Sequence, residues 1–502
     1  MKKPLVPRSK PGNPERGITM ILVALAMIAI IAMAALSIDV ITLYLAKLEA
    51  QRAADTAAVA AAKVIALSGI TGDPNNQSGN WALICGPDNG TNGLATRIAK
   101  ATAAQNTIGG IAATTVTVTY AAGDGNSIGK GVADCSALAL SSAFGVNPIV
   151  NVQLTRAALP NFFSRIWGNA GTNINASASA EAFNPSNSGN VGNQNNGGPL
   201  IPVQPRCVKP WVVPNLDPLN PSSTCTTDCT PIVSTSDGSI QHPGISLNGT
   251  AAGGIIGETF WLVADCQHNP NTCSFRKNGN GSGTGVQPQA NYTNSNSTSI
   301  QPPPNLLYLP ALVGTPVIAI PSCTSGDPYE EAIEGCDQPT NYSCGVPNAN
   351  VADLRQNPAN PTSDGVECLI HQGDLTNWTQ SSGQDYFNSF AAPNSYPFQI
   401  FAGSSNPIVS GASLPAGSQV TTSPSIVSLP IYDNVATSNI NPDVKNNVTF
   451  VGFLQVFINA ADNNGNVNVT VLNVAGCGNG SPPVGNPVTG NSPLPVRLIT
   501  PP

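Results

Sequence analysis

The stretch "LYLAKLEAQRAADTAAVAAAKV" at residues 43–64 decides the fold of this chain. It is rich in alanine, and it follows the uncharged run "ITMILVALAMIAIIAMAALSI" at residues 18–38. Neither Gly nor Pro occurs from residue 18 to residue 68, and Gly69 then supplies a helix stop before the turn "TGDPNN". The sequence therefore predicts one helix of about 50 residues, roughly 75 Å long at 1.5 Å per residue.

The uncharged run has 21 residues, enough to cross a hydrocarbon core of about 30 Å as a helix. Basic residues dominate the 17 residues before it, with only Glu15 against them: Lys2, Lys3, Arg8, Lys10 and Arg16. Because a short basic flank stays in the cytoplasm, we predict a cytoplasmic tail over residues 1–17 and a single transmembrane helix over residues 18–46.

A cleaved signal peptide is the alternative interpretation, because Ala32, Ala34 and Ala35 resemble a cleavage site. The helical pattern runs straight through the possible cut, which favours a retained anchor. Asp39, the first charge after the run, has two interpretations. It is either an interfacial carboxylate that marks the outer end of the span, or a buried partner for a charge on another subunit.

The helix beyond the membrane has a small-residue face, because Ala53, Ala57 and Ala61 recur every four residues. Such a face lets another element approach closely. A bare stalk in water would favour charged pairs at that spacing. We therefore predict a packing surface rather than a passive stalk.

Residues 15–62 carry an ordered pattern. An Arg-Gly pair precedes the apolar run, an Asp follows it, a Tyr stands five residues later, and a Gln precedes Ala-Ala-Asp-x-Ala-Ala. These residues are Arg16, Gly17, Asp39, Tyr44, Gln51, Ala53, Ala54, Asp55, Ala57 and Ala58. In this pattern the chain resembles the TadE/TadG-like proteins of the Flp/Tad pilus assembly system. The position five residues after Gly17 is Leu22, where Tad prepilins carry Glu, so the resemblance does not extend to prepilin processing.

The resemblance continues over residues 116–123, 147–171 and 174–182, which are similar to the family's strand, "Pro-x-Phe-Phe" turn and Ala/Ser strand. Alternating apolar residues in these segments independently indicate strands. We therefore expect residues 47–184 to form a pilin-like α+β domain, in which the long helix packs on a small antiparallel sheet. Larger TadG proteins carry an Asp-x-Ser-x-Ser metal motif, which this sequence lacks.

An Asn/Gly/Pro-rich stretch at residues 185–205 has the composition of a linker. Beyond it, residues 206–502 hold short apolar segments separated by Gly, Pro and Asn, which predicts a Cys-rich, mainly-β domain. Its best core strand is "TFVGFLQVFI" at residues 449–458, and "NAADNNGNVNVTV" at residues 459–471 predicts a hairpin.

Twelve cysteines on an exported chain predict disulfides. Cys85 and Cys135 are the two cysteines before the linker, so we expect them to pair. The candidates as a whole are Cys85, Cys135, Cys225, Cys229, Cys266, Cys273, Cys336 and Cys344. Zinc binding through Cys266, His268 and Cys273 is the alternative, but the chain has three histidines and no paired C-x-x-C set. We therefore expect neither a metal nor a cofactor.

Glu330, Glu331 and Glu334 form an acidic cluster that could serve sugar hydrolysis or calcium binding. A solvated helix start is the favoured interpretation. Recognisable catalytic motifs are missing, so we do not expect an enzyme. Only 9% of residues are charged and the net charge is −7, which argues against nucleic-acid binding.

Two functions remain. The resemblance implies a structural or accessory component of a Tad/Flp-type pilus or related envelope assembly. Such a component would be anchored in the bacterial inner membrane with most of the chain periplasmic or extracellular. Its partners would be that membrane and other pilus-assembly or envelope proteins. The alternative is an anchored exoprotein whose C-terminal domain binds or processes an extracellular polymer, as in adhesion.

Overall fold

The computed structural model describes residues 15–73, 76–122, 131–138, 147–168, 171–184, 203–219, 230–236, 238–246, 254–264, 305–313, 323, 325–335, 342–355, 357–373, 381–387, 396–411, 414–434, 445–477, 488–490 and 492–499. Two compact units make up the chain. The first comprises Met1–Ala54, Ala103–Thr117 and Gln153–Ser177, and the second comprises Asp55–Thr102, Val118–Val152 and Ala178–Pro502.

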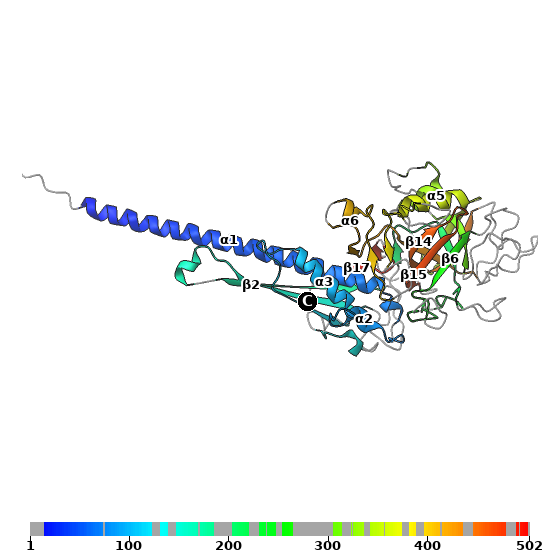
Figure 1. Cartoon of the computed structure of the whole chain (residues 1–502), viewed down its shortest axis with the longest axis horizontal. Helices are drawn as coiled ribbons and strands as arrows, with labels where there is room; N and C mark the ends of the chain where they lie inside the picture. The colour runs from blue at the N-terminus through cyan, green and yellow to red at the C-terminus, as the bar shows by residue number, and fades with distance from the viewer. Residues whose placement is uncertain are drawn as a thin grey trace, which may run out of the picture. The chain divides into compact units, whose positions relative to one another are not determined.

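The predicted long helix is confirmed: α1 (Glu15–Leu67) is a single helix of 53 residues (Figure 1). It is long and apolar enough to cross a membrane. Its large apolar side chains from Ile18 to Leu36 are exposed, whereas its alanines from Ala46 to Ala62 are mostly buried. One helix therefore presents two kinds of surface along its length.

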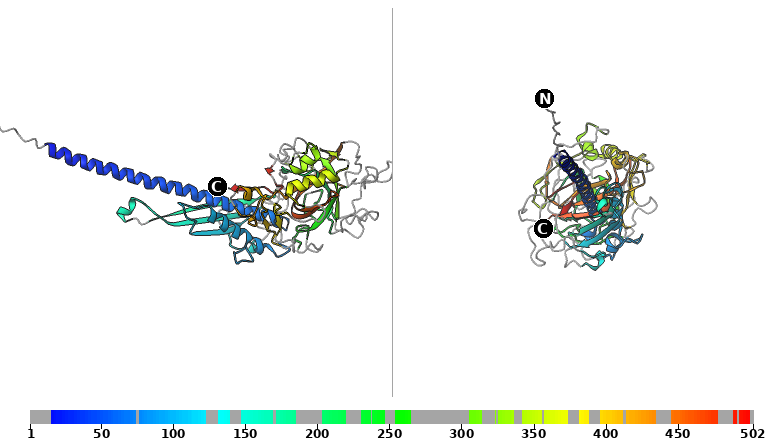
Figure 2. Two further views of the ribbon diagram at one scale, coloured as in Figure 1. Left: turned by 45° about the horizontal axis from the view of Figure 1, so that its top comes forward. Right: turned by 90° about the vertical axis from the view of Figure 1, so that its left-hand side faces the viewer.

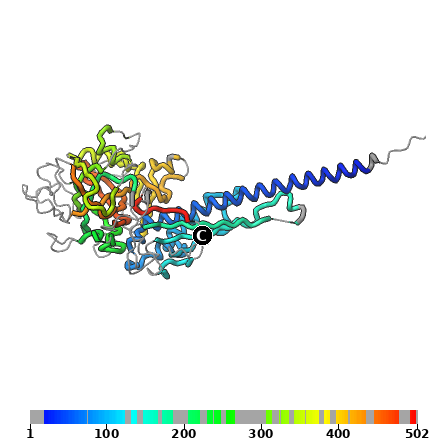
Figure 3. The backbone as a smooth tube through the Cα atoms, turned by 180° about the vertical axis from the view of Figure 1, so that it is seen from behind, coloured from blue at the N-terminus to red at the C-terminus, as the bar shows by residue number. Residues whose placement is uncertain are grey.

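A four-stranded sheet has the order β1 (Thr115–Ala121), β2 (Ile149–Leu159), β3 (Thr172–Ala182) and β17 (Val496–Ile499). The strands predicted near residues 116–123 and 174–182 are confirmed as β1 and β3. β17 was not predicted to lie here. It runs antiparallel to β3, with Val496 opposite Ala182, and Figure 3 shows this red C-terminal segment beside β3.

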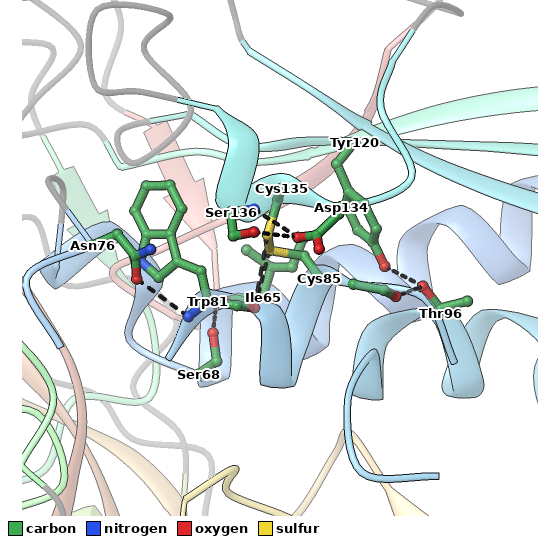
Figure 4. The surroundings of a disulfide bond; sticks show 11 residues. Ile65, Ser68, Asn76, Trp81, Cys85, Thr96, Tyr120, Asp134, Cys135 and Ser136 are labelled. Atoms are coloured by element: carbon green, nitrogen blue, oxygen red, sulfur yellow. Dashed lines mark hydrogen bonds between the residues drawn. A yellow bond between two sulfur atoms is a disulfide. The ribbon is translucent and has the colours of Figure 1, made fainter. Parts of the chain in front are cut away.

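The second unit holds the disulfide between Cys85 and Cys135, the pair predicted from the sequence (Figure 4). Cys85 ends the short helix α2 (Trp81–Cys85), and Cys135 begins the 3-10 turn η2 (Cys135–Ala137). Trp81 and both cysteines are fully buried. Nearby, the hydroxyls of Tyr120 and Thr96 share a hydrogen bond of 2.6 Å, and Thr96 belongs to α3 (Leu94–Gln105).

The C-terminal part is mainly β, as predicted. Its largest sheet has the order β13-β8-β7-β5-β12-β14-β15-β6, and an additional pairing joins β6 to β7. That pairing closes six of the strands into a ring. The strands are β5 (Trp211–Pro214), β6 (Thr259–Ala264), β7 (Asn305–Leu312), β8 (Asn350–Leu354), β12 (Ile426–Tyr432), β13 (Asn446–Val448), β14 (Phe450–Ala461) and β15 (Val467–Gly476).

The predicted hairpin is confirmed, because β14 and β15 pair antiparallel. The predicted core strand is also confirmed: every residue of β14 from Phe450 to Ile458 is buried. Asp462 organises the turn, since its carboxylate accepts hydrogen bonds from the backbone N–H groups of Asn464 and Asn466, both at 2.9 Å.

Helices accompany this sheet. α4 (Pro328–Glu334) contacts α5 (Ala359–Ile370), and α5 contacts β14. Figure 2 shows the yellow-green helices against the orange strands. The remaining short elements are α6 (Pro407–Ser410), β4 (Val203–Pro205), β9 (Tyr386–Phe387), β10 (Ile400–Phe401), β11 (Gln419–Val420) and β16 (Val488–Gly490).

Two disulfides of the C-terminal part include cysteines that were not among the candidates. Cys344 pairs with Cys477, 133 residues away, and Cys323 pairs with Cys368. Every cysteine among the described residues is disulfide-bonded. Of the other candidates, Cys225, Cys229, Cys266, Cys273 and Cys336 lie outside the described residues, as does most of the predicted linker at residues 185–205.

The end of α1 is tied to the C-terminal sheet within the second unit. Asn473 of β15 is fully buried, and its side-chain amide donates to the carbonyl oxygen of Ala66 at 2.8 Å and to the Thr71 hydroxyl at 3.0 Å. The last carbonyls of a helix lack partners inside the helix, so this amide satisfies one of them. Next to it, a Cβ added at Gly69 would lie 2.2 Å from the Ile256 side chain, and the backbone there has a φ of +76°.

Replacing Asn473 with Ala should therefore destabilise the second unit. The change leaves a buried carbonyl and a buried hydroxyl without their partner, at a cost of about 2–3 kcal/mol. Chemical denaturation of the full chain in detergent measures this loss. Asn447→Ala is the matched control, because Asn447 is exposed on β13, and it should leave the free energy of unfolding unchanged. Equal stability of the two variants would contradict the tie.

Candidate functional site

The site lies on α1 in the first unit, where the uncharged run ends. Asp39 is 3% exposed. Its carboxylate accepts hydrogen bonds from the backbone N–H groups of Phe162 at 2.9 Å, Phe163 at 3.1 Å and Ser164 at 2.7 Å. These residues follow β2 and form the turn into the 3-10 segment η4 (Ser164–Trp167). The carboxylate thus holds three successive backbone donors of one turn.

The need for such an acceptor follows from the local backbone. The first N–H groups of a helical turn have no partners inside it, and a capping side chain usually satisfies them. η4 has Phe163 at its cap position and no capping side chain of its own. Asp39 supplies the missing acceptor from a different element, 123 to 125 residues earlier in the chain.

The polar contacts of α1 continue along β3. Lys47 donates to the carbonyl oxygen of Asn175, and Gln51 donates to that of Ser177 at 2.9 Å. Four residues advance a helix by about 6 Å, and two residues advance a strand by about 6.6 to 6.8 Å. The spacing of Lys47 and Gln51 therefore matches that of alternate carbonyl groups on β3. Asp39 lies in the same row of side chains along α1 as Lys47 and Gln51, since the three positions differ by multiples of four.

A further contact fixes α1 in the first unit: the backbone N–H of Gly109 donates to the Glu49 carboxylate at 2.7 Å. The hairpin that α1 holds is itself cross-linked, because the side chains of Asn161 and Thr172 exchange hydrogen bonds of 3.1 and 3.2 Å. The turn is therefore held both by α1 and by the strands on either side.

The alanine face of α1 is buried. Ala50, Ala53, Ala54, Ala57, Ala58, Ala61 and Ala62 all have 0% exposure, and Ala46 has 2%. The other face carries Tyr44, Leu45 and Leu48, with exposures of 65%, 53% and 49%. Phe162, in the turn that Asp39 holds, is 65% exposed. Large apolar side chains thus remain exposed beside a face that is already packed.

The other residues singled out from the sequence lie as follows. Arg16 and Gly17 lie in the first turn of α1, and Asp55 is half-buried. The zinc alternative, Cys266 with His268 and Cys273, lies outside the described residues. Both interpretations of Asp39 missed its role in holding the turn. The sequence shows both partners of this contact, the Asp after the apolar run and the "PNFF" turn at residues 160–163, but nothing in it pairs the two segments.

The acidic cluster differs from the solvated helix start that the sequence predicted. α4 is a helix, as expected, and Asp327 caps it by accepting from the N–H of Tyr329 at 3.0 Å. Glu334, however, is 2% exposed rather than solvated. Burial, followed by the Glu330 carboxylate, raises the pKa of Glu334 to about 7. Lys209, also buried, donates to the carbonyl oxygens of Ile333 and Gly335, both at 2.6 Å, so its ammonium group holds the end of α4.

Comparison with known proteins confirms the resemblance for the N-terminal portion. Residues 17–64 match the model of a family described as putative Flp pilus-assembly TadE/G-like. No curated protein and no solved structure matches the chain. The matched segment includes Asp39, Lys47 and Gln51 and the whole of the buried alanine face, Ala46 to Ala62.

Replacing Asp39 with Ala should release the turn at residues 162–164, because three backbone donors lose their acceptor. Hydrogen exchange of the full chain in detergent should show faster exchange of these amides. Glu49→Ala is the matched control: it should speed exchange at Gly109 and leave the turn protected. Unchanged exchange at residues 162–164 in the Asp39 variant would show that the carboxylate does not hold the turn.

Replacing Ala57 with Leu should overpack the buried alanine face, at a cost of roughly 1–3 kcal/mol. Helix propensity cannot produce this loss, since Leu forms helices almost as well as Ala. Thr56→Leu, at an exposed neighbouring position, is the control and should be nearly neutral. Thermal unfolding and protease resistance of the full chain measure both, and an unchanged melting temperature for Ala57→Leu would mean that this face touches nothing.

Proposed function

We propose that the chain is a membrane-anchored structural or accessory component of a Tad/Flp-type pilus or a related envelope assembly. One observation carries the proposal: the segment that matches the pilus-assembly family model, residues 17–64, is the same helix that exposes an apolar half and packs its other half. The family match indicates the system, and the two surfaces of α1 suggest how the chain takes part in it.

The exposed apolar half supports anchoring. A contiguous apolar surface of this size on a soluble protein marks an interaction site or a membrane segment. Residues 18–38 have the length to cross a bilayer, and the basic residues before them favour a cytoplasmic N-terminus. The rest of the chain, with its disulfides, would then lie outside the cytoplasm, where disulfides persist.

Asp39 lies at the outer end of the apolar run, and its hydrogen bonds support the anchored arrangement. Asp39 is buried, and a buried carboxylate is costly unless it has hydrogen-bond partners. Asp39 has partners in its own chain, because three backbone N–H groups donate to its carboxylate. Tyr44 and Phe162 are exposed near this level, and aromatic side chains favour the membrane–water interface.

The exposed stripe on the outer half of α1, Leu45 and Leu48 with Tyr44 beside them, supports lateral packing in the assembly. A helix in a multi-subunit envelope structure can pack one face on its own domain and offer the other to a neighbour. The match to the pilus-assembly family model supports a structural role, and we propose that role rather than the polymer-binding or enzymatic alternative.

A strain that lacks the chain tests this function. Surface pili should be lost on deletion, and the wild-type chain supplied in trans should restore them. A variant with both Leu45→Ser and Leu48→Ser should accumulate to the normal level, because the changes alter only an exposed face. It should fail to restore pili, because this face supports the lateral packing. Leu36→Ala, inside the apolar run, is the control. Pilus counts by electron microscopy are the measurement, and normal pili in the deletion strain would refute the proposal.

Reporter fusions at residues 12 and 210 test the topology in the same cells. A cytoplasmic signal at residue 12 and an extracytoplasmic signal at residue 210 are expected from the distribution of basic residues. The reverse result would refute the orientation without affecting the pilus assay.

A further inference from the structure

Three side chains of types that can ligate a metal meet in the second unit, far from α1 in sequence. Asp217 follows β5, Glu258 precedes β6, and His242 lies in the segment between them. One ligand atom from each residue lies within 4.8 Å of the other two. The Nδ1 atom of His242 and the Oδ2 atom of Asp217 are 2.9 Å apart.

The backbone around this cluster is well fixed. The carbonyl oxygen of Glu258 accepts from the N–H of Val471 on β15 at 2.9 Å, and the carbonyl oxygen of His242 accepts from the N–H of Ile255 at 3.1 Å. Two residues before Asp217, the side-chain amide of Asn215 exchanges hydrogen bonds of 2.7 and 2.9 Å with the backbone of Val233. The strands and loops therefore set the three side chains in place.

Glu258 gives an independent indication of a ligand. The residue is 0% exposed, and neither of its carboxylate oxygens has a hydrogen-bond partner. Asp217 is also fully buried beside it. Buried carboxylates are normally paired or bound to metals, because an unpaired buried charge is strongly destabilising.

We propose that Asp217, His242 and Glu258 bind a divalent transition-metal ion, for which Zn²⁺ is the first probe. One imidazole nitrogen and two carboxylate oxygens are all ligands that zinc accepts. Calcium and magnesium fit this set less well, because they favour six or more oxygen ligands and seldom use imidazole. Bound zinc would link the end of β5 to the start of β6 and neutralise the buried carboxylates.

A proton is the competing way to neutralise the pair. Burial, and then the Asp217 carboxylate, raises the pKa of Glu258 to about 10, so a protonated Glu258 could donate to Asp217. The two explanations differ in what removes the excess charge, and metal analysis separates them directly.

The full chain, purified in detergent without chelators, carries the test. Bound metal is counted by mass spectrometry, zinc affinity is measured by calorimetry after dialysis against EDTA, and the melting temperature is recorded with and without Zn²⁺. The variants are Glu258→Gln, which keeps the shape and removes the charge, and His242→Gln. Glu334→Gln is the matched control, because Glu334 is also buried with an unpartnered oxygen but belongs to α4 and lies beside Lys209.

We expect one zinc ion per chain, and a melting temperature that rises with Zn²⁺, in the wild type and in Glu334→Gln. In Glu258→Gln and His242→Gln, zinc affinity should fall by at least ~100-fold, more than the loss of an outer partner causes. His242 is partly exposed, with 22% of its side chain accessible, so its variant decides the question if Glu258→Gln fails to fold. A wild-type chain that binds no zinc, or variants that bind it as tightly, would overturn the site.

Discussion

The Asp39 carboxylate, bound to three successive backbone N–H groups of the turn at residues 162–164, is the interaction on which the account of α1 depends. It occurs where the uncharged run ends, so it fixes the point at which the exposed apolar half of the helix gives way to the packed half. Lys47 and Gln51 extend the contact along β3 at matching spacing. A buried carboxylate that would be costly without partners instead positions the hairpin.

The small side chains of α1 are the second constraint. Alanine side chains let another element approach the helix closely, and they lose no side-chain entropy when they are buried. α1 is therefore buried on its alanine face, while its other face stays open. Within the second unit, Asn473 and the crowded Gly69 hold the end of this helix against the C-terminal sheet. β17 returns to pair with β3, so the last residues of the chain complete a sheet whose other strands lie more than 300 residues earlier.

Sequence patterns predicted the features that depend on local chemistry. The absence of Gly and Pro predicted α1, the alternating segments predicted β1 and β3, and the Asn-Gly pair predicted the hairpin of β14 and β15. Features that depend on distant contacts were not predictable, because nothing local specifies them. The role of Asp39, the partner of Cys344 and the position of β17 are of this kind. Glu334 was expected to be solvated, since a helix start is usually exposed, but the packing around α4 buries it.

We propose that α1 is one helix with an apolar half in the membrane and an outer half packed on its own chain. Hydrogen exchange of the full chain in lipid nanodiscs tests it most directly. Peptides from residues 18–38 should exchange slowly because lipid excludes water, and peptides from residues 43–64 should be equally slow because the alanine face is buried. Fast exchange over residues 43–64 beside slow exchange over residues 18–38 would show a frayed stalk on a membrane anchor, and would contradict the account.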